Sequence, residues 1–395
     1  MARSRSQSAP RMTRDATRLV ALAQSLNRSG SRVEDVFWET QLGEAIPKLL
    51  KAGQDAPLEA ALDHLAQSDV GAYEVLIEQA ETLSESMKIE KNGVRYDVLL
   101  IVAPIVAWTR YAIPTGPISA SAQQALLAQL HGHVLSSNAR TALMPMLVSV
   151  DQMPRTFSET WQWLQRLGAE TTKPALNTDT ETANMLADTR YIVGTVAVPE
   201  GEPIFRWQEH VGDADASRDA CLAQWAAQAQ PTLAALLPGC GFEALLPDAY
   251  YVSNREADRQ VRPLSLRAAV SWLEGAVNLE AAQLRAVVAG CGEGRIDEYR
   301  IGFTARNSND VYYGCVWPLY GREEDLVMDE GQPDVVDEIA ALLKEYGVTD
   351  VRRIPGVLPP EYCEDCGAPY FPNPLGELVH AELPEDAEAA PAQFH

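Results

Sequence analysis

The stretch RYDVLLIVAPIVAWTRYAIP at residues 95–114 decides the fold class. It begins with a charged residue and a tyrosine, continues in β-branched and other apolar residues, and carries Trp108 near its end. This composition predicts β-structure, which we interpret as a hairpin that turns near Pro104. Two later stretches share the pattern, RYIVGTVAVPEGEPIFRWQ at 190–208 and EYRIGFTARNSNDVYYGCVWP at 298–318.

A helix and then a proline-containing strand are predicted after each of these hairpins, and a further helix before it. The helices before the hairpins are predicted at about 73–90, 157–169 and 264–289. The helices after them are predicted at 119–137, 215–237 and 333–347, and the strands at 141–150, 242–252 and 348–358. Because proline cannot donate a ladder hydrogen bond, we expect these strands at sheet edges or at bends.

This order predicts an α+β fold of repeated helix–hairpin–helix–strand units, an internal repeat. Consecutive units would form ferredoxin-like split βαβ sheets covered by helices on one face. The predicted segments are a disordered basic tail at 1–18, an N-terminal helical segment at 19–72, α+β units at 73–154, 155–262 and 263–360, a cysteine knuckle at 361–380, and a disordered acidic tail at 381–395.

The composition limits the cellular compartment and the classes of partner that we expect. The net charge of −23 repels phosphate backbones, so we expect no nucleic acid on the acidic body. No apolar run approaches the roughly 20 residues that a membrane crossing needs. Six cysteines, together with an opening MARSRSQSAPRMTR that does not resemble a secretory signal, predict reduced thiols in the cytoplasm.

The strongest chemical motif is YCEDCGAPYFPNPLGELVH at residues 362–380. Cys363 and Cys366 have the C-x2-C spacing at which two thiolates reach one zinc ion from a tight turn. Gly367 permits the left-handed backbone that such turns use. His380 follows at a distance comparable with the spacing of ligand pairs in small zinc modules. The sequence therefore predicts three local ligands of a structural zinc ion.

The fourth ligand is not in the local sequence. Cys315 is our candidate if the knuckle folds back on the third unit, and Cys291, His395 or a residue of a second chain are alternatives. Two other interpretations of the cysteine pair stay open, namely thiols without a metal and a redox pair. We expect the neighbouring carboxylates of Glu364 and Asp365 to raise the thiol pKa, which disfavours the redox interpretation.

Two resemblances follow from these stretches. CEDCG resembles the first knuckle of the DnaK-suppressor/TraR class of zinc-finger transcription regulators, but the second CxxC of that class does not follow here, so its action on RNA polymerase is not carried over. As a whole, the chain resembles an uncharacterised betaproteobacterial domain-of-unknown-function family of large acidic proteins, through ESMKIEKNGVRYDVLLIVAPIVAWTRYAIPTG and YCEDCGAPYFPNPLGELVHAELPE. This resemblance implies a bacterial cytoplasm and no particular activity.

Two classes of function are compatible with the sequence. We favour a non-enzymatic binding or scaffolding protein that presents sheet or cleft surfaces to a protein partner or small ligand, with homo-oligomers among the expected assemblies. The alternative is an enzyme with an active site in a cleft between the units, where Cys315, Trp317, Arg255 and the knuckle would converge.

Overall fold

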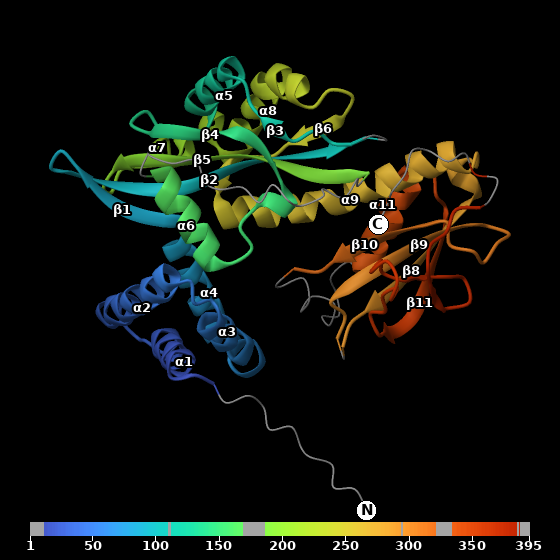
Figure 1. The fold of residues 1–395 in the computed structure, drawn as a ribbon, viewed down its shortest axis with the longest axis horizontal. Helices are drawn as coiled ribbons and strands as arrows, with labels where there is room; N and C mark the ends of the chain where they lie inside the picture. The colour runs from blue at the N-terminus through green and yellow to red at the C-terminus, as the bar shows by residue number, and fades with distance from the viewer. Residues whose placement is uncertain are drawn as a thin grey trace, which may run out of the picture.

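The computed structural model describes residues 12–109, 112–168, 186–293, 295–320, 334–384 and 387 (Figure 1). It opens with helices α1 (Arg14–Asn27), α2 (Arg32–Ala52), α3 (Ala56–Ser68) and α4 (Val70–Glu85). Their facing sides share one apolar core, so the prediction of N-terminal helices is confirmed. Helix α1 begins inside the range predicted as a basic tail because Thr13 caps it, accepting a hydrogen bond from the amide of Ala16.

The first sheet is antiparallel and is built around one long strand. Its order is β1 (Ser86–Lys91), β2 (Val94–Trp108), β5 (Ala187–Pro199), β4 (Arg140–Ser149) and β3 (Gly116–Pro117). Strands β6 (Gly241–Ala244) and β7 (Asp248–Ala249) continue the edge of β2 that β1 begins. Strand β4 contains Pro145 and changes register between Leu143 and Leu147, which confirms the expected bend there.

The hairpin predicted at 95–114 is wrong, because β2 runs unbroken from Val94 to Trp108. Its Pro104 does not disturb the ladder. The carbonyl oxygen of Pro104 accepts from the amide of Leu245, which lies in the short segment between β6 and β7. The N–H that proline lacks would point to the same side as this carbonyl, so it falls in the gap between those two short strands.

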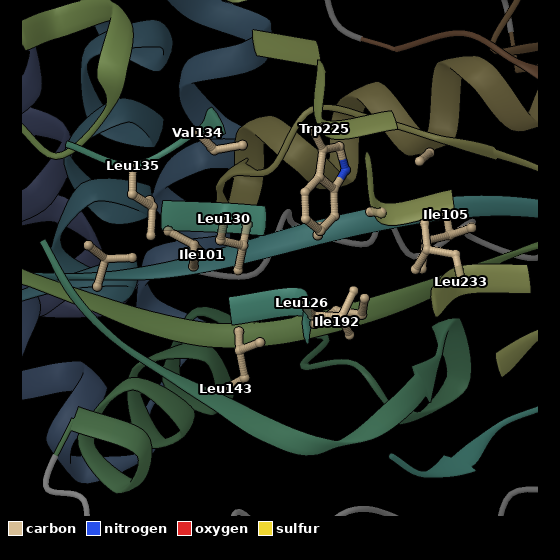
Figure 2. Packing of buried hydrophobic residues seen from close by; sticks show 14 of the residues in the cluster. Ile101, Ile105, Leu126, Leu130, Val134, Leu135, Leu143, Ile192, Trp225 and Leu233 are labelled. Carbon is tan, nitrogen blue, oxygen red and sulfur yellow. The ribbon is translucent and has the colours of Figure 1, made fainter. Parts of the chain in front are cut away.

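Helices cover both faces of the first sheet, which corrects the prediction of one covered face (Figure 1). Helices α5 (Ala120–His133) and α8 (Arg218–Leu236) pack on one face, where Leu126, Leu130 and Trp225 meet Ile101 and Ile105 (Figure 2). Helix α6 (Phe157–Gly168) and the first half of α9 (Tyr250–Ala276) cover the other face. The physical reason is the almost continuous apolar sequence of β2, which leaves no polar face for solvent.

Helix α9 belongs to two cores. Tyr250, Ala257 and Leu264 pack under the first sheet, whereas Leu266 and Leu273 pack on the second. The helix predicted at 264–289 is therefore wrong in its last part, where residues 284–291 form β8 (Leu284–Cys291). Every residue of β8 is buried, so its sequence carries neither helical nor strand periodicity.

The second sheet has the order β10 (Tyr313–Pro318), β9 (Glu298–Ala305), β8 and β11 (Asp350–Leu358), with α11 (Val335–Glu345) packed beside α9. Strands β9 and β10 form the hairpin predicted at 298–318. Strand β11 pairs parallel with β8 and is an edge strand. At 190–208, by contrast, β5 leads through a loop into the short helix α7 (Arg206–Glu209). The three stretches thus differ within the described residues, and the fold supports a mixed α+β class.

A buried carboxylate lies where α4 meets α9. The Oε2 atom of Glu85 accepts from the amide of Tyr251 at 3.0 Å. Burial raises the pKa of Glu85 to about 7, although this amide and Arg255 favour the charged form. Arg255 itself pairs with Glu81 of α4 at 2.6 Å. Among the described helices, none is long and apolar enough to cross a bilayer.

Candidate metal centre and the adjoining cavity

The knuckle, residues 361–380, begins with a tight turn around the two cysteines. The amide of Cys363 donates to the carbonyl of Ala368 at 2.8 Å, and the amide of Gly367 donates back to the carbonyl of Cys363 at 2.9 Å. Gly367 has φ of +73°, the left-handed conformation that the sequence predicted for it. The turn thus brings the sulfur atoms of Cys363 and Cys366 close together.

A short hairpin then brings the histidine back to the turn. Strand β12 (Phe371–Pro372) pairs antiparallel with β13 (Leu378–Val379), and Asn373 organises the loop between them by accepting from the amides of Leu375 and Glu377. Because Phe371 lies opposite Val379, the next position of the ladder places His380 beside Tyr370, whose ring centroid is 6.3 Å away. The residues between Cys366 and His380 therefore form the hairpin that returns His380 to the cysteine turn.

The ligand atoms of Cys363, Cys366 and His380 all lie within 4.8 Å of one another. The Sγ atom of Cys366 is 3.3 Å from Nε2 of His380. Tetrahedral zinc, with bonds of about 2.3 Å to sulfur and about 2.0 Å to nitrogen, places such a pair about 3.5 Å apart. The donor set and its spacing fit a zinc ion.

The surroundings of Cys363 contradict the expected effect of the acidic neighbours. The backbone amides of Cys366 and Asp365 point at the sulfur of Cys363 and lower its thiol pKa, with smaller contributions from the Cys366 thiol and the Tyr370 hydroxyl. The prediction of a raised thiol pKa is therefore wrong for Cys363. The side chains of Glu364 and Asp365 are exposed, so water screens their charges, whereas the amides act at hydrogen-bond range.

Arg300 of β9 fixes the base of the knuckle to the second sheet. This side chain is fully buried, and its Nη1 donates to the carbonyls of Glu361 at 2.6 Å and Tyr370 at 2.9 Å, on the two sides of the cysteine turn. Its Nε donates to Glu298 at 2.7 Å, and its guanidinium lies 4.8 Å from the ring centroid of Tyr362. Arg300 was not among the predicted site residues, although an arginine inside the apolar run of 299–303 indicates a buried partner.

Cys315 stands apart from this group. It lies on β10, where its Sγ is 3.7 Å from the carbonyl oxygen of Ser265, and burial raises the pKa of its thiol to about 12. Cys291 is buried at the end of β8, and His395 lies outside the described residues. The three ligand atoms that the structure gathers are those of the knuckle, and neither cysteine is among them.

A cavity of about 710 Å³ adjoins the knuckle, and we call it the α9 cavity. Its walls come from the start of β5, one face of α9, the strand β10 and the segments 368–371 and 380–383. His380 belongs both to this wall and to the group of metal ligands. The volume is in the range of small-molecule sites. Cys315 lines this cavity, whereas Trp317 and Arg255 are not part of its wall, so only part of the predicted convergence is seen.

Carboxylates supply the charge at the wall of the α9 cavity. Asp188 is paired with Arg190, which is 2% exposed, and accepts from the amide of Thr189 at 2.8 Å. Burial raises the pKa of Asp188 in spite of these partners. Burial likewise raises the pKa of Asp258 on α9, against the attraction of Arg262 and Arg259. Of the described residues, no lysine or arginine lines the cavity.

The fold and this group of donors define a mixed α+β protein with a candidate Cys2His metal centre beside an apolar cavity. The chain belongs to the family described as Protein of unknown function (DUF2863), whose model matches residues 4–394. No curated protein and no solved structure matches the chain.

Proposed function

We propose that this protein is a non-enzymatic binding protein. In this proposal the knuckle holds a structural zinc ion, and the α9 cavity holds a small, largely apolar ligand. The proximity of Cys363, Cys366 and His380, all within 4.8 Å of one another, is the observation that carries it. His380 links the two features because its ring belongs to both the ligand group and the cavity wall.

A structural role for the metal follows from how little secondary structure the knuckle has. Strands β12 and β13 contain two residues each, and a segment of this size rarely keeps one conformation without a crosslink or a metal. The amides that face Cys363 stabilise the thiolate that zinc requires. A water molecule or a donor from a second copy of the chain would complete the tetrahedron, since Cys315 lies elsewhere in this arrangement.

The enzyme alternative rests on one observation, the presence of Cys315 and His380 in the wall of the same cavity. A nucleophilic cysteine must ionise, and burial raises the pKa of the Cys315 thiol to about 12. His380 is turned with its Nε2 toward Cys366. Both observations favour binding over covalent chemistry.

Metal analysis tests the proposal. Protein purified without added metal should contain about one zinc ion per chain, and Cys363→Ser and His380→Ala should each remove most of it. Cys240→Ser is the matched control because Cys240 is a half-buried thiol that packs against the core of the first sheet and does not belong to the ligand group. Less than about 0.2 zinc ions per wild-type chain would contradict the proposal.

A further inference from the structure

The α9 cavity is elongated along its helix. Asp258, Val261, Ser265 and Trp272 line it at spacings of three, four and seven residues, which places them on one face of α9. At a rise of about 1.5 Å per residue, this face extends about 21 Å.

Strand β10 runs along the same face in the opposite direction. Tyr313 lies 5.3 Å from Trp272 between ring centroids, and Pro318, at the other end of β10, accepts from Arg262 at 2.9 Å. Cys315 contacts Ser265 between them. These contacts give the cavity two ends, one near Asp258 and one near Trp272.

The two ends differ in chemistry. Near Trp272 the wall is aromatic, with the tilted ring of Tyr313 beside it and Phe371 packed over Gly314. Near the first sheet the wall carries the carboxylates of Asp188 and Asp258. A third carboxylate of the wall, Glu382, lies at the knuckle, 3.7 Å from Nδ1 of His380, and its side chain is 82% exposed. The middle is formed by small or apolar side chains such as Val261 and Cys315. A ligand that fills this space is long, apolar over most of its length and polar at one end.

Asp258 is the carboxylate with capacity for a ligand. Asp188 is already held by Arg190 and by the amide of Thr189, and the exposed Glu382 lies 3.7 Å from Nδ1 of His380. Among the described residues, by contrast, Asp258 accepts no hydrogen bond and forms no ion pair, although Arg262 and Arg259 attract its charge from a greater distance. The two arginines that attract the Asp258 carboxylate, Arg262 and Arg259, contact other groups. Arg262 donates to Pro318 and lies over the Trp317 ring, and Arg259 pairs with Glu256.

We infer that the α9 cavity binds an elongated amphipathic amine, with its cationic head at Asp258 and its apolar or aromatic body extending toward Trp272 and Tyr313. This inference rests on the proposed binding function and names its ligand class. A carboxylate attracts a cation, and the aromatic rings at the other end offer apolar surface to the body of the ligand. The net charge of −23 and the lack of a described lysine or arginine in the wall disfavour carboxylates and phosphates.

Three probes of equal length and different charge test the inference. They are 4-phenylbutylamine, 4-phenylbutanol and 4-phenylbutyrate, each titrated into the zinc-loaded full-length protein by calorimetry. The amine should bind about tenfold or more tightly than the carboxylate, with the alcohol between them. Asp258→Asn should reduce amine affinity to that of the alcohol and leave alcohol affinity unchanged.

Matched variants separate the effect of the Asp258 carboxylate from that of the protein's overall negative charge. Glu44→Gln removes the same charge from an exposed position of α2 outside the cavity wall and should leave the preference for the amine intact. Val261→Trp fills the middle of the cavity and should weaken the amine and the alcohol together. Thermal unfolding of each variant checks that it is folded.

The outcomes distinguish this inference from the proposed function. Binding of the alcohol and the carboxylate as tight as that of the amine would overturn the ligand class and preserve the binding function. An amine preference that survives in Asp258→Asn would overturn the position of the head. The absence of binding by all three probes up to millimolar concentration would overturn both, while the zinc content would still report on the knuckle separately.

Discussion

Glu85 offers the sharpest quantitative test of the packing between α4 and α9. Its folded-state pKa of about 7 compares with an ordinary value of 4.5, and burial is the largest cause. At about 1.4 kcal/mol per pH unit, this interval corresponds to about 3 kcal/mol. Because the pKa is raised on folding, the folded state binds more protons than the unfolded state between these two values. Stability should therefore fall as pH rises from about 4.5 to about 7, and then level off.

Glu85→Gln removes this titration while keeping an oxygen for the amide of Tyr251. The variant should match the wild type near pH 4.5 and exceed its free energy of unfolding by about 3 kcal/mol at pH 8. Urea unfolding followed by tryptophan fluorescence, at half-unit steps from pH 4.5 to 8, measures the difference. Glu78→Gln, an exposed change on the same helix, is the control and should shift stability by less than about 0.5 kcal/mol.

Parallel stability curves for wild type and Glu85→Gln across this pH range would refute the reasoning. A difference that grows toward low pH would do so as well, since it would mean that the charged carboxylate is the stabilised form. Parallel curves would mean that the contributions of Arg255 and the amide of Tyr251 cancel the cost of burial, and the second result would mean that they exceed it.

Two further predictions concern the attachment of the knuckle. Arg300→Met removes the donors to Glu361 and Tyr370, so zinc should be lost to a competing chelator at about 10- to 100-fold lower chelator concentration, whereas the exposed Arg295→Met should not change it; equal zinc retention in both variants would contradict the role of Arg300. Gly314→Ala places a methyl group 2.2 Å from the ring of Phe371 and should destabilise the protein by about 1–3 kcal/mol in urea unfolding, whereas Gly132→Ala, which meets no atom within 4 Å, should be neutral or slightly stabilising. A Gly314→Ala variant as stable as the wild type would contradict the close packing of Phe371 against β10.

The fold could be predicted from the sequence wherever periodicity and turn residues were present. Helix α11 and the hairpin of β9 and β10 carry both signals, and both were predicted. Strand β2 was divided in error because a central proline usually ends a strand, and the gap between β6 and β7 that accommodates Pro104 comes from residues about 140 positions later. Strand β8 was taken as helix because burial on both faces removes the periodicity that distinguishes the two.

At the site, local spacing was informative and distant contacts were not. Cys363, Cys366 and His380 were predicted as ligands from 18 consecutive residues, and a turn and a hairpin bring them together. The α9 cavity could not be predicted, because its wall combines a strand of the first sheet, a helix and the knuckle. Arg300 was missed for the same reason, since both carbonyls that it holds lie about 60 to 70 positions away.

Helix α9 sets a constraint on how the chain can change in length. Leu264 packs in one core and Leu266 in the next, so both cores depend on the same continuous turns. One inserted or deleted residue between them would rotate everything that follows by about 100° and shift it by about 1.5 Å. A substitution on α9 changes the packing at one position, whereas a single-codon insertion or deletion would misalign one half of the molecule against the other.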